Sequence, residues 1–180
     1  MKYLYLILLF SSFTFGQKFE LTSTGFVNAE DNSKNYVVIE SPGKTQSELY
    51  KQTLIMLNKK YKSAKDVVSG VEPETITVNA LAAKQIRRTG MHSFKNQYNV
   101  VISFKDGKIK VDAPTFELYT FDYGKKQVMM LDGGFSLDGS YFGIYNKKGV
   151  VKIEKAVEDL NAFANSFVED IKNAGTNSDW

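Results

Sequence analysis

One short segment has the residue types that nucleotide chemistry would need. Gly43–Thr45 follows an apolar run, as the last part of a phosphate-binding loop would. Such a loop needs an earlier glycine where this chain has Val38, and Pro42 lacks the N–H that would face an anion. We therefore interpret the segment as a strand-to-helix connection, in which Thr45 is the N-cap and Glu48 completes a capping box.

The only histidine is the second candidate for chemistry. His92 lies in the polar segment "RRTGMHSFKN", and a general base needs a second group that orients it. No such partner can be identified, so we expect a solvated loop residue. One histidine and no cysteine also rule out a histidine- or thiolate-ligated metal site, a thiol nucleophile and disulfides.

The third candidate is a pair of carboxylates for glycoside hydrolysis. The residues available for it are Asp112, Asp122, Asp132 and Asp138. Two of them stand beside glycines, where aspartate commonly hydrogen-bonds the turn backbone, and the calcium-loop spacing is absent. The sequence therefore predicts turns here, with no catalytic residue, no metal and no cofactor.

A possible interaction surface combines aromatic and basic residues. Tyr119, Phe121 and Tyr123 follow one another at a spacing of two, so in a strand they share a face. Arg87 and Arg88 belong to a basic cluster with Lys84 and Lys95, which could meet phosphates or anionic lipid. Core packing for the aromatic residues and a solvated loop for the basic ones are the structural alternatives.

The first residues resemble a secretory signal peptide. Lys2 precedes an apolar stretch, and Thr14 and Gly16 fit the small-residue positions of a cleavage site before Gln17. The apolar stretch is too short for a membrane span, which takes about 18 residues or more. We expect residues 1–16 to be removed and residues 17–180 to form one exported domain without a transmembrane segment.

Charge gives little indication of a partner. The chain has 23 Lys and Arg against 20 Asp and Glu, and its charge falls to +2 when Lys2 is removed. Near balance is not what a nucleic-acid reader needs, so no nucleic-acid partner is expected. An unknown envelope protein or a small ligand remains.

Periodicity predicts an α+β fold. A buried strand at 36–40 precedes an amphipathic helix from Gln46 to about Tyr61, and alternating strands follow. The turn Asp106-Gly107 fixes a hairpin in which Phe104 faces Ile109, with further pairs Ile102 with Val111 and Val100 with Ala113.

A second amphipathic helix ends the domain. Its apolar stripe runs from Ile153 to Ile171. The residues expected to face away from the core are Glu158, Asp159, Asn165 and Lys172. Residues 172–180 are expected to form a flexible tail.

Two stretches resemble a known family. They are "YVVIESPGKTQSELYKQTLIMLNKKYKSAKDVVSGVEPETITVNA" and "YNVVISFKDGKIKV". They are similar to an uncharacterised exported family, found mainly in Bacteroidetes and described as a domain of unknown function with a TBP-like fold. The resemblance implies a β-α-β-β-β-β-α order, with an antiparallel sheet covered by two helices. It implies no functional residue, and DNA binding does not follow from the name of the fold.

The leading hypothesis is a non-catalytic exported module that binds or scaffolds in the periplasm or cell envelope. The alternative is a carrier of a small apolar ligand or lipid, with a cleft between the sheet and the helix Val151–Lys172. A carboxylate-based hydrolase is the third possibility.

Overall fold

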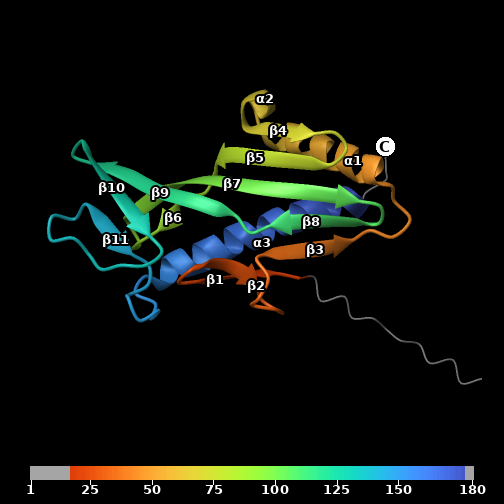
Figure 1. Ribbon diagram of the computed structural model, residues 1–180. Helices are drawn as coiled ribbons and strands as arrows, with labels where there is room; N and C mark the ends of the chain where they lie inside the picture. The colour runs from red at the N-terminus through yellow and green to blue at the C-terminus, as the bar shows by residue number, and fades with distance from the viewer. Residues whose placement is uncertain (1–16, 177–180) are drawn as a thin grey trace, which may run out of the picture.

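The computed structural model describes residues 17–176, so the expected signal peptide lies outside the described residues. The fold is α+β, with a long antiparallel sheet and helices on one of its faces (Figure 1). The elements in chain order are β1 (Phe19–Thr22), β2 (Gly25–Asn28), β3 (Tyr36–Glu40), α1 (Gln46–Lys60), α2 (Ala64–Val67), β4 (Val68–Val71), β5 (Thr75–Leu81), β6 (Ile86–Arg87), β7 (Ser93–Lys105), β8 (Lys108–Asp112), β9 (Thr115–Asp122), β10 (Lys125–Met130), β11 (Tyr141–Gly143) and α3 (Glu154–Thr176).

The central strand is β7, which is 13 residues long. One edge of β7 pairs with β5, while its other edge pairs first with β9 and then with β8. The sheet therefore forks: β8 and β3 extend one half, and β9, β10 and β11 extend the other. This second half reaches beyond the helices in Figure 1.

The β7–β8 hairpin has the predicted pairs Phe104 with Ile109 and Ile102 with Val111, and Lys105 pairs with Lys108 beside the turn. The last predicted pair, Val100 with Ala113, is wrong. Strand β8 ends at Asp112, and Ala113 continues only the pairing with the β3 side, where its N–H donates to Asn35 O at 2.8 Å. Pro114 has no N–H to offer a ladder, so the pairing with β7 resumes in β9, shifted by one residue.

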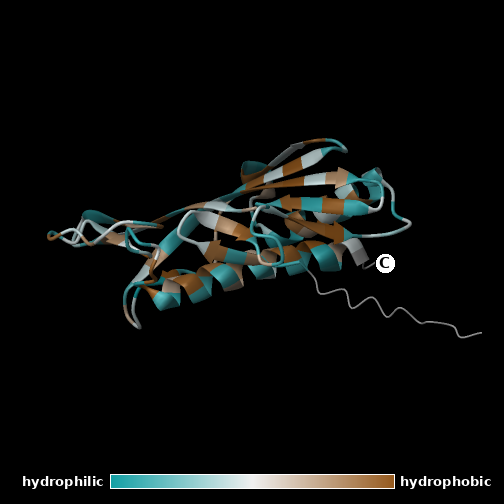
Figure 2. Cartoon of the chain, turned by 60° about the horizontal axis from the view of Figure 1, so that its bottom comes forward, coloured by the Kyte–Doolittle hydropathy of each residue, from teal (hydrophilic) through white to brown (hydrophobic). Residues whose placement is uncertain are grey.

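The core lies between the sheet and the two long helices. Alternate side chains of β7 from Phe94 to Phe104 are buried, which places one face of the sheet against α1 and α3. Figure 2 shows α3 along this face with its apolar side toward the strands. The stripe of α3 is packed tightly there, because Leu160, Ala164 and Ile171 are all inaccessible to solvent.

Helix α1 begins with the capping box. The Glu48 N–H donates to Thr45 Oγ1 at 3.3 Å, and the Thr45 N–H donates to Glu48 Oε2 at 2.8 Å. The Gln46 N–H donates to Asp106 Oδ1 at 2.8 Å, which ties the start of the helix to the β7–β8 turn. The segment thus starts the helix that covers the sheet.

The side of helix α3 that the sequence predicts to face solvent is partly covered by another element. Asn161 and Asn165, one turn apart, bind the backbone of β1: Asn165 accepts from the Phe19 N–H at 2.8 Å and donates to Phe19 O at 3.0 Å. Asn161 Oδ1 accepts from the Leu21 N–H at 2.8 Å. The β1–β2 hairpin therefore covers a second side of α3, and the outward placement of Asn165 is wrong.

The predicted tail also begins too early. Residues 172–176 continue α3. Gly175 is buried, and a Cβ there would lie 3.4 Å from Ser41 Oγ and 3.7 Å from Ile109 Cδ1. The absence of a side chain lets the last turn of the helix approach the sheet, which the polar sequence "NAGT" conceals.

Candidate functional site

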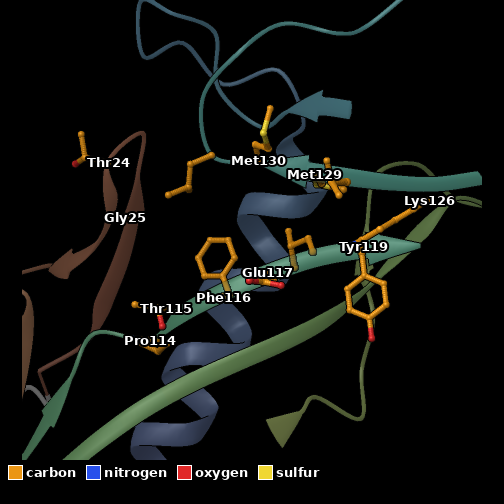
Figure 3. A pocket seen from close by; sticks show the side chains of 13 residues that line it. Thr24, Gly25, Pro114, Thr115, Phe116, Glu117, Tyr119, Lys126, Met129 and Met130 are labelled. Carbon is orange, nitrogen blue, oxygen red and sulfur yellow. The ribbon is translucent and has the colours of Figure 1, made fainter. Parts of the chain in front are cut away.

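A pocket of about 500 Å³ opens where β10 separates from β9 (Figure 3). The two strands pair from Asp122 with Lys125 down to Leu118 with Met129. Beyond that point β10 turns toward β11, and the β1–β2 turn at Thr24 forms the opposite wall. The first three residues of β9, 115–117, pair with β7 alone. Their other edge faces the pocket.

The two sides of the pocket differ in chemistry. Strand register places Phe116, Leu118 and Met129 on the helix-covered side, and all three are apolar. The open side carries Glu117 and Tyr119 beside more apolar lining. The difference follows from the alternation of side chains along β9.

Two lysines stand beside Tyr119 on the open side. Lys95 Nζ lies 6.0 Å from the centre of the Tyr119 ring, and Lys126 Nζ lies 5.4 Å from it. Phe121 meets the same ring edge to face, with centroids 6.2 Å apart. Neither lysine has an ion-pair partner among residues 17–176. Unpaired cations over an aromatic face make this rim positive.

The three predicted aromatic residues lie in the outer half of the sheet, which we call the distal lobe (residues 119–141). Phe121 is 61% exposed, and Tyr123 is fully exposed in the β9–β10 turn. Tyr123 is the one described non-glycine residue with positive φ, at 47°, and is followed by Gly124 at 78°. Leu137, in the loop before β11, is also fully exposed. Figures 1 and 2 show both loops at the same end of the molecule.

The two predicted arginines have different environments, and neither lies at the pocket. Arg87 forms a two-point ion pair with Asp159 of α3, with Nε to Oδ2 and NH2 to Oδ1 both 2.8 Å. Lys84 Nζ is 3.3 Å from the same carboxylate. Asp159 is only 3% exposed, so its predicted outward placement is wrong.

The electrostatics of this ion pair are set by opposing effects. Burial alone would raise the pKa of Asp159. Hydrogen bonds from the Arg87 side chain and N–H, with a contribution from Lys84, outweigh burial and hold this pKa below its usual value. The cluster therefore joins β6 to α3 as an ionised group.

His92 is not the solvated residue that the sequence predicts. Its ring lies between Phe94 and Phe142, with centroids 4.9 and 5.8 Å away, and its Nε2 is buried without a hydrogen-bond partner. Arg88 stacks on the same Phe142, with Cζ 3.9 Å from the ring centre, and its NH1 is 3.3 Å from His92 Nδ1. Among residues 17–176, no carboxylate or carbonyl bonds this imidazole in the way that would orient it as a general base.

Two of the aspartates considered for hydrolysis bond to residues close to them in the chain. Asp138 accepts from the Ser140 N–H at 3.1 Å, and hydrogen bonds from Ser140 lower its pKa. Asp112 pairs with Lys110 at 2.8 Å. Within the described part of the chain, no three His, Asp or Glu residues are placed to hold a metal ion.

The cleft predicted between the sheet and α3 is instead a packed interface, and none of the residues lining the pocket comes from α3. Sequence reasoning named Tyr119 but missed Met129 and Lys126. A signal existed in "KQVMML", where apolar residues occupy both faces of one strand. Such a pattern indicates a strand contacted on both sides.

No helix among residues 17–176 is both long and apolar enough to cross a bilayer.

Two solved structures have a similar fold. A crystal structure of a TBP-like protein from Parabacteroides distasonis superposes with a TM-score of 0.61, at 15% identity, over 80% of this chain and 92% of that one. A DUF4468 family protein from Bacteroides ovatus gives 0.54, also at 15% identity, over 80% and 86%. No curated protein sequence matches the chain.

The family resemblance read from the sequence is confirmed as well. Residues 36–119 match the sequence profile of the family described as "Domain of unknown function (DUF4468) with TBP-like fold". That range extends from β3 to the middle of β9 and so includes one wall of the pocket. Over residues 36–119, the chain therefore resembles this family of TBP-like domains of unknown function.

Proposed function

We propose that this chain is an exported, non-catalytic binding module of the periplasm or cell envelope, and that the distal lobe carries its binding surface. One observation carries the proposal. Among residues 17–176, six of the eleven exposed large apolar side chains lie between residues 121 and 141. Apolar side chains gathered on one part of a surface mark interaction sites more often than scattered ones do.

The turn between β9 and β10 supports this assignment. A two-residue hairpin turn with positive φ at both positions favours Asn-Gly or Asp-Gly. This chain instead has Tyr123, a bulky residue in a backbone conformation that disfavours it, with its ring wholly in solvent. A residue that suits neither the turn nor the core is better explained by a contact made outside the chain.

The groups that could act as catalysts support a non-catalytic role. His92 contacts two aromatic rings and a guanidinium, and Asp159 is fully engaged by Arg87 and Lys84. Asp138 serves a turn. Catalysis by any of these groups would require its present partners to be displaced.

Site-specific photocrosslinking in a Gram-negative host tests the binding surface. We would place benzoylphenylalanine at Tyr123 or Leu137 and, as a matched control, at Lys51, an exposed position on α1. We expect a discrete adduct from the distal-lobe positions and none from the control. Equal labelling at all three positions, or none at any, would contradict the proposal.

Export is tested separately by mass spectrometry of the full-length chain after fractionation of the cells. Cleavage predicts a mature protein that begins at Gln17 in the envelope or periplasmic fraction, while a chain lacking residues 2–16 stays in the cytoplasm. Retention of the intact N-terminus in the cytoplasm would contradict export.

A further inference from the structure

We propose that the pocket binds an extended peptide segment of a partner protein, which adds as a short strand to the free edge of β9 at Thr115–Glu117. This inference rests on the proposed function, because it names the ligand class of a binding module. It assigns the anchor of that interaction to the pocket.

The first argument is the free strand edge. In an antiparallel ladder, successive residues direct their N–H and C=O groups alternately toward and away from the neighbouring strand. Residues 115–117 pair with β7 on one side, and no hydrogen bond is found on their other side among residues 17–176. An acyl chain would leave these groups without partners, whereas a peptide backbone supplies both donors and acceptors.

The alternation of the pocket walls is the second argument. An extended peptide directs its side chains alternately to opposite faces. On the helix-covered side, Phe116, Leu118 and Met129 would surround a large apolar side chain. On the open side, the next residue of the peptide would meet Glu117 and Lys126. A peptide of alternating apolar and charged residues matches both sides.

Charge decides which charged residue the peptide carries. Lys95 and Lys126 flank Tyr119 without ion-pair partners in the described chain, and Glu117 is the one acidic residue that lines the pocket. Two cations against one anion make an acidic side chain the complementary one. The pocket volume of about 500 Å³ suits one apolar anchor, being within the range of ordinary ligand sites.

The pocket is tested with the peptide acetyl-Thr-Asp-Leu-Asp-Thr-amide and an ¹⁵N-labelled chain of residues 17–180, followed by NMR. We expect amide shifts at residues 115–118 and 129–131. Replacing the leucine by alanine should weaken binding by about tenfold, because much of the apolar contact is lost.

Two N-methylated peptides test the strand pairing itself. Methylation of the leucine nitrogen and of the following aspartate nitrogen removes N–H groups that point in opposite directions. Pairing with β9 predicts that one of the two peptides loses binding and the other keeps it. Equal binding by both would show that no strand is added and would overturn the proposal.

Charge reversal tests the rim. The double substitution Lys95→Glu with Lys126→Glu should lower the affinity for the acidic peptide by about threefold to fivefold at low salt. The peptide with lysine in place of aspartate should bind the doubly substituted chain more tightly than it binds the original chain. Lys155→Glu, on an exposed part of α3, is the matched control and should change neither affinity.

Two further outcomes separate the proposals. If sodium laurate shifts residues 115–118 and the peptide does not, the pocket belongs to an amphiphile carrier and the peptide inference is wrong. If the peptide fails while Tyr123 still gives a discrete adduct, the binding module stands and only its pocket assignment is lost. Failure of both measurements would overturn both.

Discussion

The Arg87 guanidinium holds the Asp159 carboxylate at two points, with Nε to Oδ2 and NH2 to Oδ1 both at 2.8 Å. The Arg87 N–H adds a third bond to Oδ2 at 3.0 Å. These bonds join the two-residue strand β6 to the N-terminal part of α3. A strand this short has little pairing of its own, so the ion pair fixes where the β6–β7 hairpin lies.

Removing Arg87 should therefore destabilise the fold strongly. Arg87→Met leaves a buried carboxylate with Lys84 alone, and we expect the free energy of unfolding to fall by about 3 kcal/mol. Adding Asp159→Leu should recover much of this loss, because an apolar pair needs no desolvated charge. Urea denaturation measures both, and Lys155→Met, on the exposed side of α3, is the control. A loss as small as that of the control would contradict the structural role of the pair.

Acid should weaken the same contact. The folded pKa of Asp159 lies below its usual value, so ionised Asp159 stabilises the fold at every pH above its unfolded pKa, about 3.9. This contribution is lost as the pH falls from that value through the folded pKa. Asp159→Asn should reduce the slope of the unfolding free energy against pH in that window. Near pH 7 the slope should be the same in the two proteins. Identical slopes for the two proteins, measured by urea titration from pH 2.5 to 7, would argue against this assignment.

Asn165 should hold the N-terminal hairpin to α3. Its side chain makes two hydrogen bonds with the backbone of Phe19, so Asn165→Ala leaves both backbone groups unpaired. We expect a loss of about 2 kcal/mol in the free energy of unfolding and faster amide exchange at Phe19 and Leu21. Asn58→Ala is a matched control, because the Asn58 side chain bonds only within its own helix, to Leu54 O. Unchanged exchange in β1 would refute the attachment.

Tyr123 should show a conflict between stability and binding. Tyr123→Asn suits the positive φ of 47° and should raise the free energy of unfolding by about 0.5 kcal/mol. Gly124→Ala, at φ 78°, should lower it by about 1 kcal/mol. If the ring contacts a partner, Tyr123→Asn should also reduce the adduct formed from benzoylphenylalanine at position 137. A more stable variant with unchanged adduct yield would remove Tyr123 from the binding surface.

His92 should be replaceable by an apolar ring. Its Nε2 is buried without a partner, so His92→Phe removes an unsatisfied polar atom and keeps the contacts with Phe94 and Phe142. The substitution also removes the hydrogen bond of Nδ1 with Arg88 NH1, which is long at 3.3 Å. We expect stability to stay the same or rise by up to about 1 kcal/mol, as judged by urea denaturation. His92→Ala should lower it, because the ring contacts are lost. A clear loss in the phenylalanine variant would mean that the imidazole is needed as such.

The predictable parts of the fold are those in which neighbouring residues decide the structure. The alternation in β7, the Asp106-Gly107 turn and the stripe of α3 each bury one face of a single element, so their pattern is visible along the chain. Thr45 and Glu48 are three residues apart and complete each other's hydrogen bonds. The family resemblance rests on these local features too.

The sequence failed where a distant element changes the environment of a residue. Asp159 and Asn165 read as solvated because both are polar and lie off the apolar stripe of α3. They are covered because β6 and β1 pack there, and their partners Arg87 and Phe19 are 72 and 146 positions away. A helix sequence shows which side is apolar, but it does not show that a polar side has a specific partner.

The candidate pocket divides in the same way. The sequence by itself determined that Tyr119 and Phe121 share one face of a strand, since side-chain direction follows from strand geometry alone. The prediction that Tyr123 shares this face is wrong, because β9 ends at Asp122 and Tyr123 lies in the β9–β10 turn. Only the tertiary structure decided that the pairing of β10 with β9 ends at Met129. It also decided that the β1–β2 turn lies at the opening that results. Where two strands part depends on what each packs against next, and those contacts come from residues far apart in the chain.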